Sequence, residues 1–139
     1  MLSKTCRYGV RAVLYLSIHT DVNALLGVKE LSQKIEVSIP MLSKVLQFLT
    51  RKNVIKSKKG RNGGFYMTEN QKNMHLMDVI QQLERSEYLI TACLLGQKHC
   101  TTHNNCPYHE KVAAIRTELR AIYNRDSIRT SALKLKQNL

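Results

Sequence analysis

Three cysteines and one histidine lie close together between residues 93 and 109. Cys93, Cys100, Cys106 and His109 follow the spacing C-x6-C-x5-C-x2-H. Thiolate and imidazole groups are soft or borderline ligands, so four of them on one short segment can close on a single metal centre. Thiols bind metal only when deprotonated, and the excess of Lys and Arg, with a helix starting at Pro107, would favour that form. The segment therefore predicts a metal site.

The spacing leaves the metal open between iron-sulfur and zinc. Three cysteines with one histidine also fit structural zinc, although zinc sites more often contain a C-x2-C pair, which this sequence lacks. His99 and His103 are further candidate ligands, and unmetallated thiols in a loop are the third interpretation. Cys6 is different, because it lies on the apolar stripe of an N-terminal helix and is expected to be a buried core thiol.

A second group of polar and basic residues lies on one face of a short helix predicted to start after Ser38. Ser38 is a candidate N-cap, and Pro40 falls in the first turn, where its missing N–H does no harm. A preceding short helix, from Val28 to about Lys34, and a four-residue connection complete a helix-turn-helix. The outer face of the later helix can enter the DNA major groove, where such side chains bond base edges. The residues expected to contact DNA from this helix are Ser38, Pro40, Met41, Ser43, Lys44, Gln47 and Arg51, with Ser43, Lys44 and Gln47 the best placed.

Two short strands are predicted after this helix, over 54–58 and 64–67. The turn between them combines glycine, which permits positive φ and a close approach of the backbone to another surface, with basic side chains. We expect this β-hairpin to be a wing that contacts phosphates or the adjacent minor groove, which gives position and salt dependence rather than sequence information. Its contacting residues are expected to be Lys56, Lys58, Lys59 and Arg61.

The charge of the chain favours a polyanionic partner. The sequence has 22 Lys and Arg against 10 Asp and Glu, a formal net charge of +12, and residues 1–64 alone hold 12 basic and 3 acidic residues. A ribosome-associated or merely soluble basic protein is the alternative that charge alone leaves open. No segment has the pattern of a signal peptide or a membrane helix, so we expect a cytoplasmic location, where clustered cysteines indicate metal or redox chemistry rather than disulfides.

Helical periodicity dominates the rest of the chain. Helices are predicted over residues 6–18, over 76–83, from Pro107 to about Asn124, and in a short final segment capped by Ser127. The long helix has a single apolar stripe, and a helix of that kind needs a partner. The stripe consists of Val112, Ile115, Leu119 and Ile122.

The chain resembles the Rrf-two superfamily of bacterial winged-helix regulators over nearly its whole length. The segments that carry the resemblance are 7–16 in the first helix, 42–47 in the recognition helix and 59–65 in the wing. In the cluster-binding members, of the IscR, NsrR and RirA type, three cysteines before the long dimer helix ligate an iron-sulfur cluster. Cys93, Cys100 and Cys106 correspond to these cysteines.

The resemblance also implies a fourth ligand. His109 matches the histidine that IscR adds three residues after its last cysteine, whereas Arg7 stands where NsrR uses an acidic residue. This favours a [2Fe-2S] cluster held by three cysteines and a histidine over a [4Fe-4S] form. The chain departs from the family pattern in its longer first cysteine gap, in Lys59 where arginine is usual, and in Ser43, which replaces an acidic residue.

These observations predict a mainly α fold with a small β-hairpin, in which a winged helix-turn-helix precedes a long C-terminal dimerisation helix. Residues 1–70 are expected to form the DNA-binding domain, and residues 71–139 the cluster-binding loop (86–109) and the dimerisation helices. The expected function is a homodimeric regulator that binds a palindromic operator in double-stranded DNA, with an iron-sulfur cluster modulating its affinity in response to iron, redox state or nitric oxide.

Two alternatives remain at this point. The same DNA reader could use its cysteines as a zinc or thiol-redox switch. Outside this class, an enzyme with a nucleophilic cysteine could use a nearby histidine as its base, but no oxyanion-hole motif is legible in the sequence. The sequence therefore predicts that the chain is not an enzyme.

Overall fold

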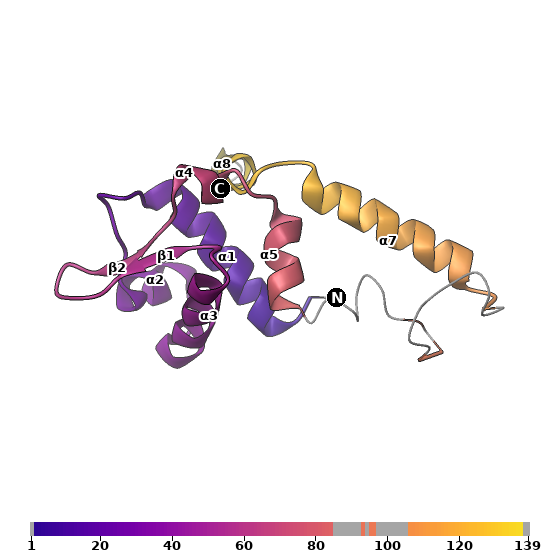
Figure 1. The fold of residues 1–139 in the computed structure, drawn as a ribbon, viewed down its shortest axis with the longest axis horizontal. Helices are drawn as coiled ribbons and strands as arrows, with labels where there is room; N and C mark the ends of the chain where they lie inside the picture. Colours follow the sequence, from indigo (N-terminus) through magenta and orange to yellow (C-terminus); the bar gives the residue numbers. More distant parts are fainter. Residues whose placement is uncertain (1, 85–92, 94, 97–105, 138–139) are drawn as a thin grey trace.

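Helices form most of the chain, of which the computed structural model describes residues 2–84, 93, 95–96 and 106–137. A two-stranded antiparallel hairpin lies between the third and fourth helices (Figure 1). The predicted mainly α fold with one small hairpin is confirmed. In chain order the elements are α1 (Lys4–His19), α2 (Val28–Ile35), α3 (Ile39–Arg51), β1 (Lys56–Lys58), β2 (Gly64–Tyr66), α4 (Glu69–Lys72), α5 (Leu76–Leu83), α7 (His109–Asn124) and α8 (Ile128–Gln137).

Helix α1 lies at the centre of the fold and packs against α2, α3, α5 and α8. It begins two residues before its predicted start, because the Ser3 hydroxyl accepts a hydrogen bond from the Cys6 N–H (3.1 Å) and caps the helix there. Gly9 lets α5 come close, since a Cβ at this position would lie 2.2 Å from Leu83 Cδ1. Cys6 is fully buried, so its prediction as a core thiol is confirmed.

The turn between α2 and α3 is held by local hydrogen bonds. Glu36 adopts a left-handed conformation (φ 53°, ψ 50°) that ends α2, and the Val37 N–H donates back to the Ser32 carbonyl oxygen (3.2 Å). The Ser32 hydroxyl in turn donates to the Val37 carbonyl oxygen (2.6 Å). These bonds fix the direction in which α3 leaves the turn.

Strand β1 starts at Lys56, two residues later than predicted. Asn53 (φ 58°) ends α3 in a left-handed conformation, and the Val54 N–H bonds back to the Leu49 carbonyl oxygen (3.0 Å). Val54 and Ile55 are both fully buried, so neighbouring side chains enter the core instead of alternating across a strand. Lys56 pairs with Tyr66, and the register continues to the pair of residues 58 and 64.

The wing is attached to the segment before α2. Leu26 and Phe65 exchange backbone hydrogen bonds, with N···O distances of 3.0 and 2.7 Å. Gly64 permits this contact, because a Cβ there would lie 2.6 Å from the Leu26 carbonyl oxygen. The base of the hairpin is therefore fixed to the segment just before α2.

Helix α4 was not predicted, although its signal is present in the sequence. The Thr68 hydroxyl accepts from the Gln71 N–H (3.4 Å), and the Gln71 side-chain oxygen accepts from the Thr68 N–H (3.0 Å). This reciprocal pair is a capping box. The resulting single turn leads the chain from the wing towards α5.

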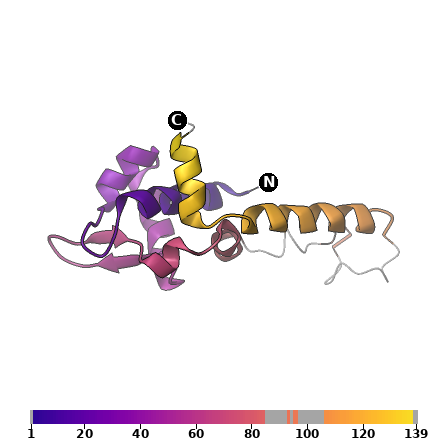
Figure 2. The ribbon, with the colours of Figure 1, turned by 90° about the horizontal axis from the view of Figure 1, so that it is seen from above.

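Helix α7 leaves the body of the molecule as an arm (Figures 1 and 2). It begins at His109, so Pro107 lies in the turn before the helix and not in its first turn as predicted. No residue of α7 is fully buried within the described chain, and Ile115 and Ile122 are 58% and 56% exposed. Val112 and Leu119 of the apolar stripe are half-buried, so the described part of the chain covers this stripe only in part and leaves Ile115 and Ile122 exposed.

Helix α8 returns from the arm and packs on α1. The Ser127 hydroxyl accepts from the Thr130 N–H (3.1 Å), which confirms the predicted cap. Ile128 is fully buried and belongs to the same core as the residues of α1 and α3, and Ala132 is 2% exposed. The C-terminal helix thus completes the core that is formed by α1, α2 and α3. None of the described helices is long and apolar enough to cross a membrane.

Candidate nucleic-acid interface and metal centre

The outer face of α3 is exposed while its inner face is anchored in the core. Four buried residues hold the helix against the hydrophobic core: Leu42, Val45, Leu46 and Leu49. Pro40 lies at the start of the helix as predicted, and Ser38 occupies the N-cap position, although its side chain makes no capping hydrogen bond with the described residues. Of the residues expected to contact DNA from α3, Ser38, Pro40, Met41, Lys44, Gln47 and Arg51 are exposed and Ser43 is half-buried.

Two residues that position α3 were missed from the sequence. Ser32 closes the turn before α3, and the Arg11 guanidinium of α1 donates a hydrogen bond to the Ile35 carbonyl oxygen at the end of α2. Both bonds join side chains to backbone atoms of another segment. The folded arrangement of α1, α2 and the turn before α3 brings these atoms together, so periodicity and capping rules give no signal for them.

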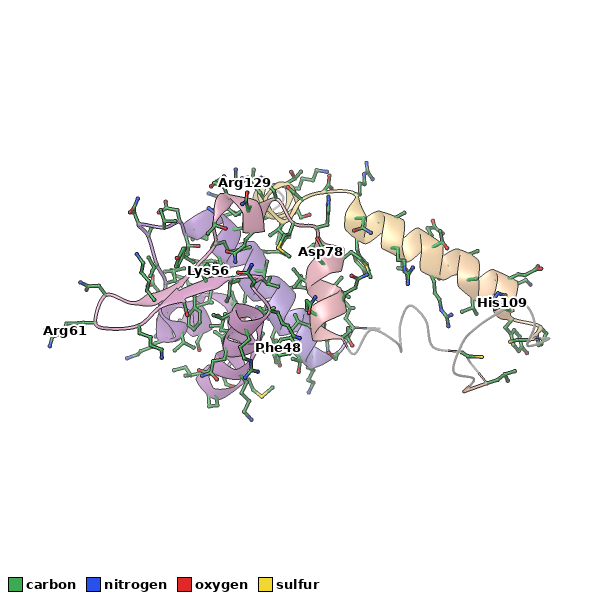
Figure 3. The ribbon with its side chains drawn as sticks, in the orientation of Figure 1. Phe48, Lys56, Arg61, Asp78, His109 and Arg129 are labelled. Atoms are coloured by element: carbon green, nitrogen blue, oxygen red, sulfur yellow. The ribbon has the colours of Figure 1, made fainter. Side chains whose placement is uncertain are left out.

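The wing carries its cations away from the body of the molecule. Lys56, Lys58, Lys59 and Arg61 are all exposed, and Figure 3 shows Arg61 at the tip of the hairpin and Lys56 at its base. The tip is closed by a hydrogen bond from the Gly63 N–H to the Gly60 carbonyl oxygen (3.0 Å). The wing therefore presents basic side chains on a well-defined turn.

The electrostatic character of this surface is uniform. Residues 37–68 contain seven Lys and Arg and no Asp or Glu. At the end of α3 the Arg51 and Lys52 cations lie 5.9 and 5.7 Å from the centre of the Phe48 ring. Cations in this last turn also suit the negative end of the helix dipole. A helix-turn-helix with such a recognition helix and wing defines a winged-helix DNA reader.

The cysteine segment is described only in part. Cys93 is buried, with 8% of its surface exposed, and its carbonyl oxygen accepts from the Gly96 N–H (3.0 Å). Cys106 is half-buried, and its carbonyl oxygen accepts from the N–H of His109, the first residue of α7 (3.1 Å). One turn of backbone thus joins the last predicted cysteine ligand to the predicted histidine ligand.

Other predicted parts of this segment lie outside the described residues. They are Cys100, His99, His103 and most of the predicted loop over 86–109. Within the described residues there is no group of three or more His, Cys, Asp and Glu side chains that could hold a metal ion. Cys6 is not one of the predicted ligands: it is fully buried in α1, and burial, followed by the charge of Glu84 and a hydrogen bond to it, raises the pKa of Cys6 to about 12.

Comparison with known families identifies the class more closely. A family model, Rrf2, described as iron-dependent transcriptional regulator, matches residues 2–129. The chain therefore belongs to the Rrf2 family, and it is a DNA-binding transcriptional regulator, not an enzyme.

Relatives of known class agree with this assignment. An HTH-type transcriptional regulator of Aquifex aeolicus is 28% identical over 131 residues, which cover 93% of this chain and 89% of that protein. The HTH-type transcriptional regulator NsrR of Oceanobacillus iheyensis is 27% identical over 105 residues, which cover 76% of this chain and 71% of the relative.

Solved structures share the fold. CymR of B. subtilis, described as the global cysteine regulator, has a TM-score of 0.78 at 18% identity, covering 96% of this chain and 97% of that one. The IscR of T. potens has a TM-score of 0.67 at 19% identity, covering 100% of this chain and 88% of the other. The predicted winged-helix architecture is thereby confirmed.

Proposed function

We propose that this regulator is a cytoplasmic homodimer whose operator affinity depends on an iron-sulfur cluster held by Cys93, Cys100, Cys106 and His109. The observation that carries the proposal is the place of these residues in the chain. The three cysteines lie in the chain between α5, which packs on α1, and α7, which leaves the body, and His109 is the first residue of α7. Membership of a family described as iron-dependent regulators supports iron as the metal.

The donor set fits such a cluster. Three thiols and an imidazole are the ligand types that iron-sulfur clusters accept, and the half-buried Cys106 and His109 are joined by one turn of backbone. When bound, the cluster supplies a redox-active centre; a [2Fe-2S] form is favoured over [4Fe-4S] because a histidine completes the set. Binding of a cluster by these ligands would restrain the segment that connects α5 to α7.

The proposed DNA contacts follow from exposure and charge. The outer face of α3 would enter the major groove, and the wing would contact phosphates or the adjacent minor groove. The proposed contact residues are Ser38, Pro40, Met41, Ser43, Lys44, Gln47 and Arg51 of the recognition helix and its N-cap, and Lys56, Lys58, Lys59 and Arg61 of the wing.

A homodimer would cover the exposed part of the apolar stripe of α7. Pairing two arms buries Ile115 and Ile122 of each copy and sets the spacing of two recognition helices, as a palindromic operator requires. Residues 1–70 then serve as the reader and residues 71–139 as the sensing and dimer-forming part, with α8 also supporting the core of the reader.

The cluster is tested by anaerobic purification. We expect a brown protein with visible absorption and with iron and sulfide in stoichiometric amounts, and operator affinity that changes when a chelator or nitric oxide removes the cluster. The triple variant Cys93→Ser, Cys100→Ser, Cys106→Ser should be colourless and unresponsive. The matched control Cys6→Ala should retain colour and response, because Cys6 is a core thiol distant in sequence from the ligand segment.

Two results would contradict the proposal. A colourless wild-type protein with stoichiometric zinc would replace the cluster by a zinc site. Identical operator affinity in the wild type and the triple variant under all redox conditions would remove the sensing role altogether. Circular dichroism of each variant separates loss of ligands from loss of fold.

A further inference from the structure

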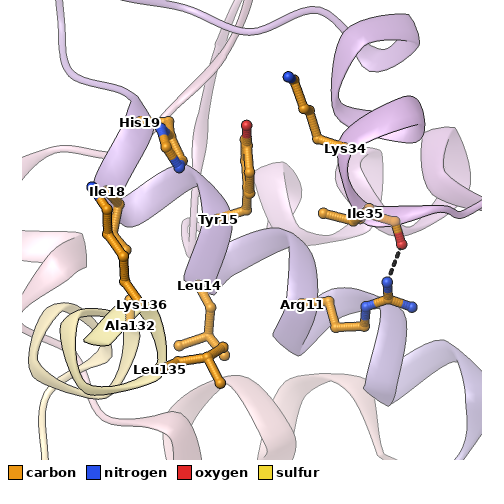
Figure 4. A pocket seen from close by; sticks show the side chains of 10 residues that line it. All are labelled: Arg11, Leu14, Tyr15, Ile18, His19, Lys34, Ile35, Ala132, Leu135 and Lys136. Carbon is orange, nitrogen blue, oxygen red and sulfur yellow. Dashed lines mark hydrogen bonds between the residues drawn. The ribbon is translucent and has the colours of Figure 1, made fainter. Parts of the chain in front are cut away.

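A cavity is lined by residues of α1, α2 and α8, and none of its lining residues belongs to the recognition helix or is a predicted metal ligand (Figure 4). Its volume is about 290 Å³. Among the apolar lining residues, Ile35 and Ala132 are 4% and 2% exposed, Leu14 and Ile18 are half-buried, and Leu135 is exposed at the edge. The interior of the cavity is therefore apolar.

The rim of the cavity is basic. Arg11 and His19 of α1, Lys34 of α2 and Lys136 of α8 all line the cavity and are exposed. Among the described lining residues there is no Asp or Glu. Partial burial, followed by the charges of Lys136 and Lys34, lowers the pKa of His19, which is the response expected of an imidazole in a positive field.

Two of the rim groups, Arg11 and His19, are held by contacts within the fold. The Arg11 guanidinium is anchored by its hydrogen bond to the Ile35 carbonyl oxygen, drawn in Figure 4. The ring of Tyr15 stacks on that of His19 at a centroid distance of 4.1 Å, so the aromatic wall is also fixed. Cations at the mouth and an apolar interior together match a ligand with one anionic end and one apolar end.

We propose that this cavity binds a small organic acid, with its carboxylate at the basic rim and its aliphatic body against the apolar interior. The volume lies at the lower end of the range for small-molecule sites, which favours a small ligand over a nucleotide or a large cofactor. The bound acid would contact α2 of the helix-turn-helix and α8 at the same time. It would therefore link the helix-turn-helix to the helix that follows α7. The site is independent of the cysteine ligands.

Isothermal titration of the intact protein with octanoate tests the proposal. Saturable binding is expected for octanoate, whereas octanamide, which has the same body without the charge, and acetate, which has the charge without the body, should not bind. Hydrogen exchange in the presence of octanoate should slow in residues 28–35 and 128–137 and stay unchanged in the wing. This second measurement places the ligand in the cavity.

Substitutions at the rim provide the control. The double variant Lys34→Gln, Lys136→Gln should lose roughly tenfold in octanoate affinity, as expected for two exposed ion pairs. Lys29→Gln removes an exposed lysine of α2 that does not line the cavity, and it should bind octanoate as the wild type does.

Three outcomes would overturn the proposal. They are no saturable binding of octanoate, equal binding of octanamide, and equal affinity in the double variant and in Lys29→Gln. Absence of saturable octanoate binding is also the result expected if a second copy of the chain fills the cavity in a dimer. None of these measurements depends on the iron content of the protein, so the cluster proposal can fail or stand separately.

Discussion

Among the exposed side chains of α3, Gln47 has the chemistry best suited to recognising a base, since an amide can pair with both adenine N6 and N7. For Gln47→Ala we expect a loss of about 1–3 kcal/mol in operator binding and a relaxed preference at one base pair. Fluorescence anisotropy with an operator selected from random duplexes, and with its single-base variants, measures both effects.

The matched change in the wing is Lys59→Gln, which should weaken DNA binding equally on all sequences. It should also reduce the slope of log affinity against log salt concentration by about one. The assignment of these roles fails if the two variants give the same pattern across sequences.

The buried thiol of Cys6 makes stability depend on pH. Its pKa is raised from 9.0 to about 12 in the folded chain, chiefly by burial, so the unfolded chain loses the thiol proton first as the pH rises. This contribution to stability is complete below pH 9 and is lost between pH 9 and about 12. Above pH 9, the free energy of unfolding should fall up to about 1.4 kcal/mol per pH unit more steeply in the wild type than in Cys6→Ala.

Denaturant unfolding of both proteins at several alkaline pH values measures this difference. The comparison of slopes is needed because Lys and Tyr side chains titrate in the same range in both proteins. Parallel stability curves would show that Cys6 keeps no unusual pKa in the folded state.

At the scale of elements, the attachment of the wing rests on one glycine. In Gly64→Ala the added Cβ would meet the Leu26 carbonyl oxygen at 2.6 Å, a backbone atom that cannot rotate away. We expect a loss of about 1–3 kcal/mol in the free energy of unfolding and weaker DNA binding, because the hairpin can no longer pair with Leu26.

Gly27→Ala is the control, since nothing lies within 4 Å of a Cβ there. Because alanine is a poorer N-cap than glycine, Gly27→Ala should cost roughly 0.5–1 kcal/mol through the end of α2, without a clash that disturbs the hairpin. Thermal or denaturant unfolding of the two variants decides the matter, and equal stabilities would contradict the role given to Gly64.

Elements with local signals could be predicted from the sequence, and contacts between distant elements could not. Pro40 and the apolar spacing of α3 mark that helix, and Ser127 marks α8. The start of β1 was predicted too early because Val54 and Ile55 are β-branched residues typical of strands. In the structure both are fully buried, and the strand begins after them.

The packing of α8 on α1, and with it the basic cavity, depends on a reversal of the chain after α7. No local sequence pattern predicts that reversal. For the metal site, the sequence supplies the ligand types and their spacing, and Cys100 lies outside the described residues, so the complete ligand set stays a prediction.

At the scale of the whole molecule, α7 is the element that a second copy would complete. Ile115 and Ile122 lie on one face and are more than half exposed, so Ile115→Glu with Ile122→Glu should leave the fold intact and abolish dimerisation. Sedimentation should then report a monomer, and operator affinity should fall because only one recognition helix is engaged at a time.

Thr117→Glu adds a charge on the opposite face of the same helix and should remain dimeric. Circular dichroism should be unchanged in both variants. A dimeric double-glutamate variant would place the interface elsewhere on the molecule.

The burial of Ile128 and Ala132 against the N-terminal part of the chain has a genetic consequence. A stop codon just after Asn124 would leave the recognition helix, the wing and every cysteine in the translated product. That product is nevertheless expected to misfold and be degraded, because the apolar face of α1 would be left open to water. Loss-of-function alleles should therefore occur among the codons for residues 125–137, which include none of the proposed DNA contacts or ligands.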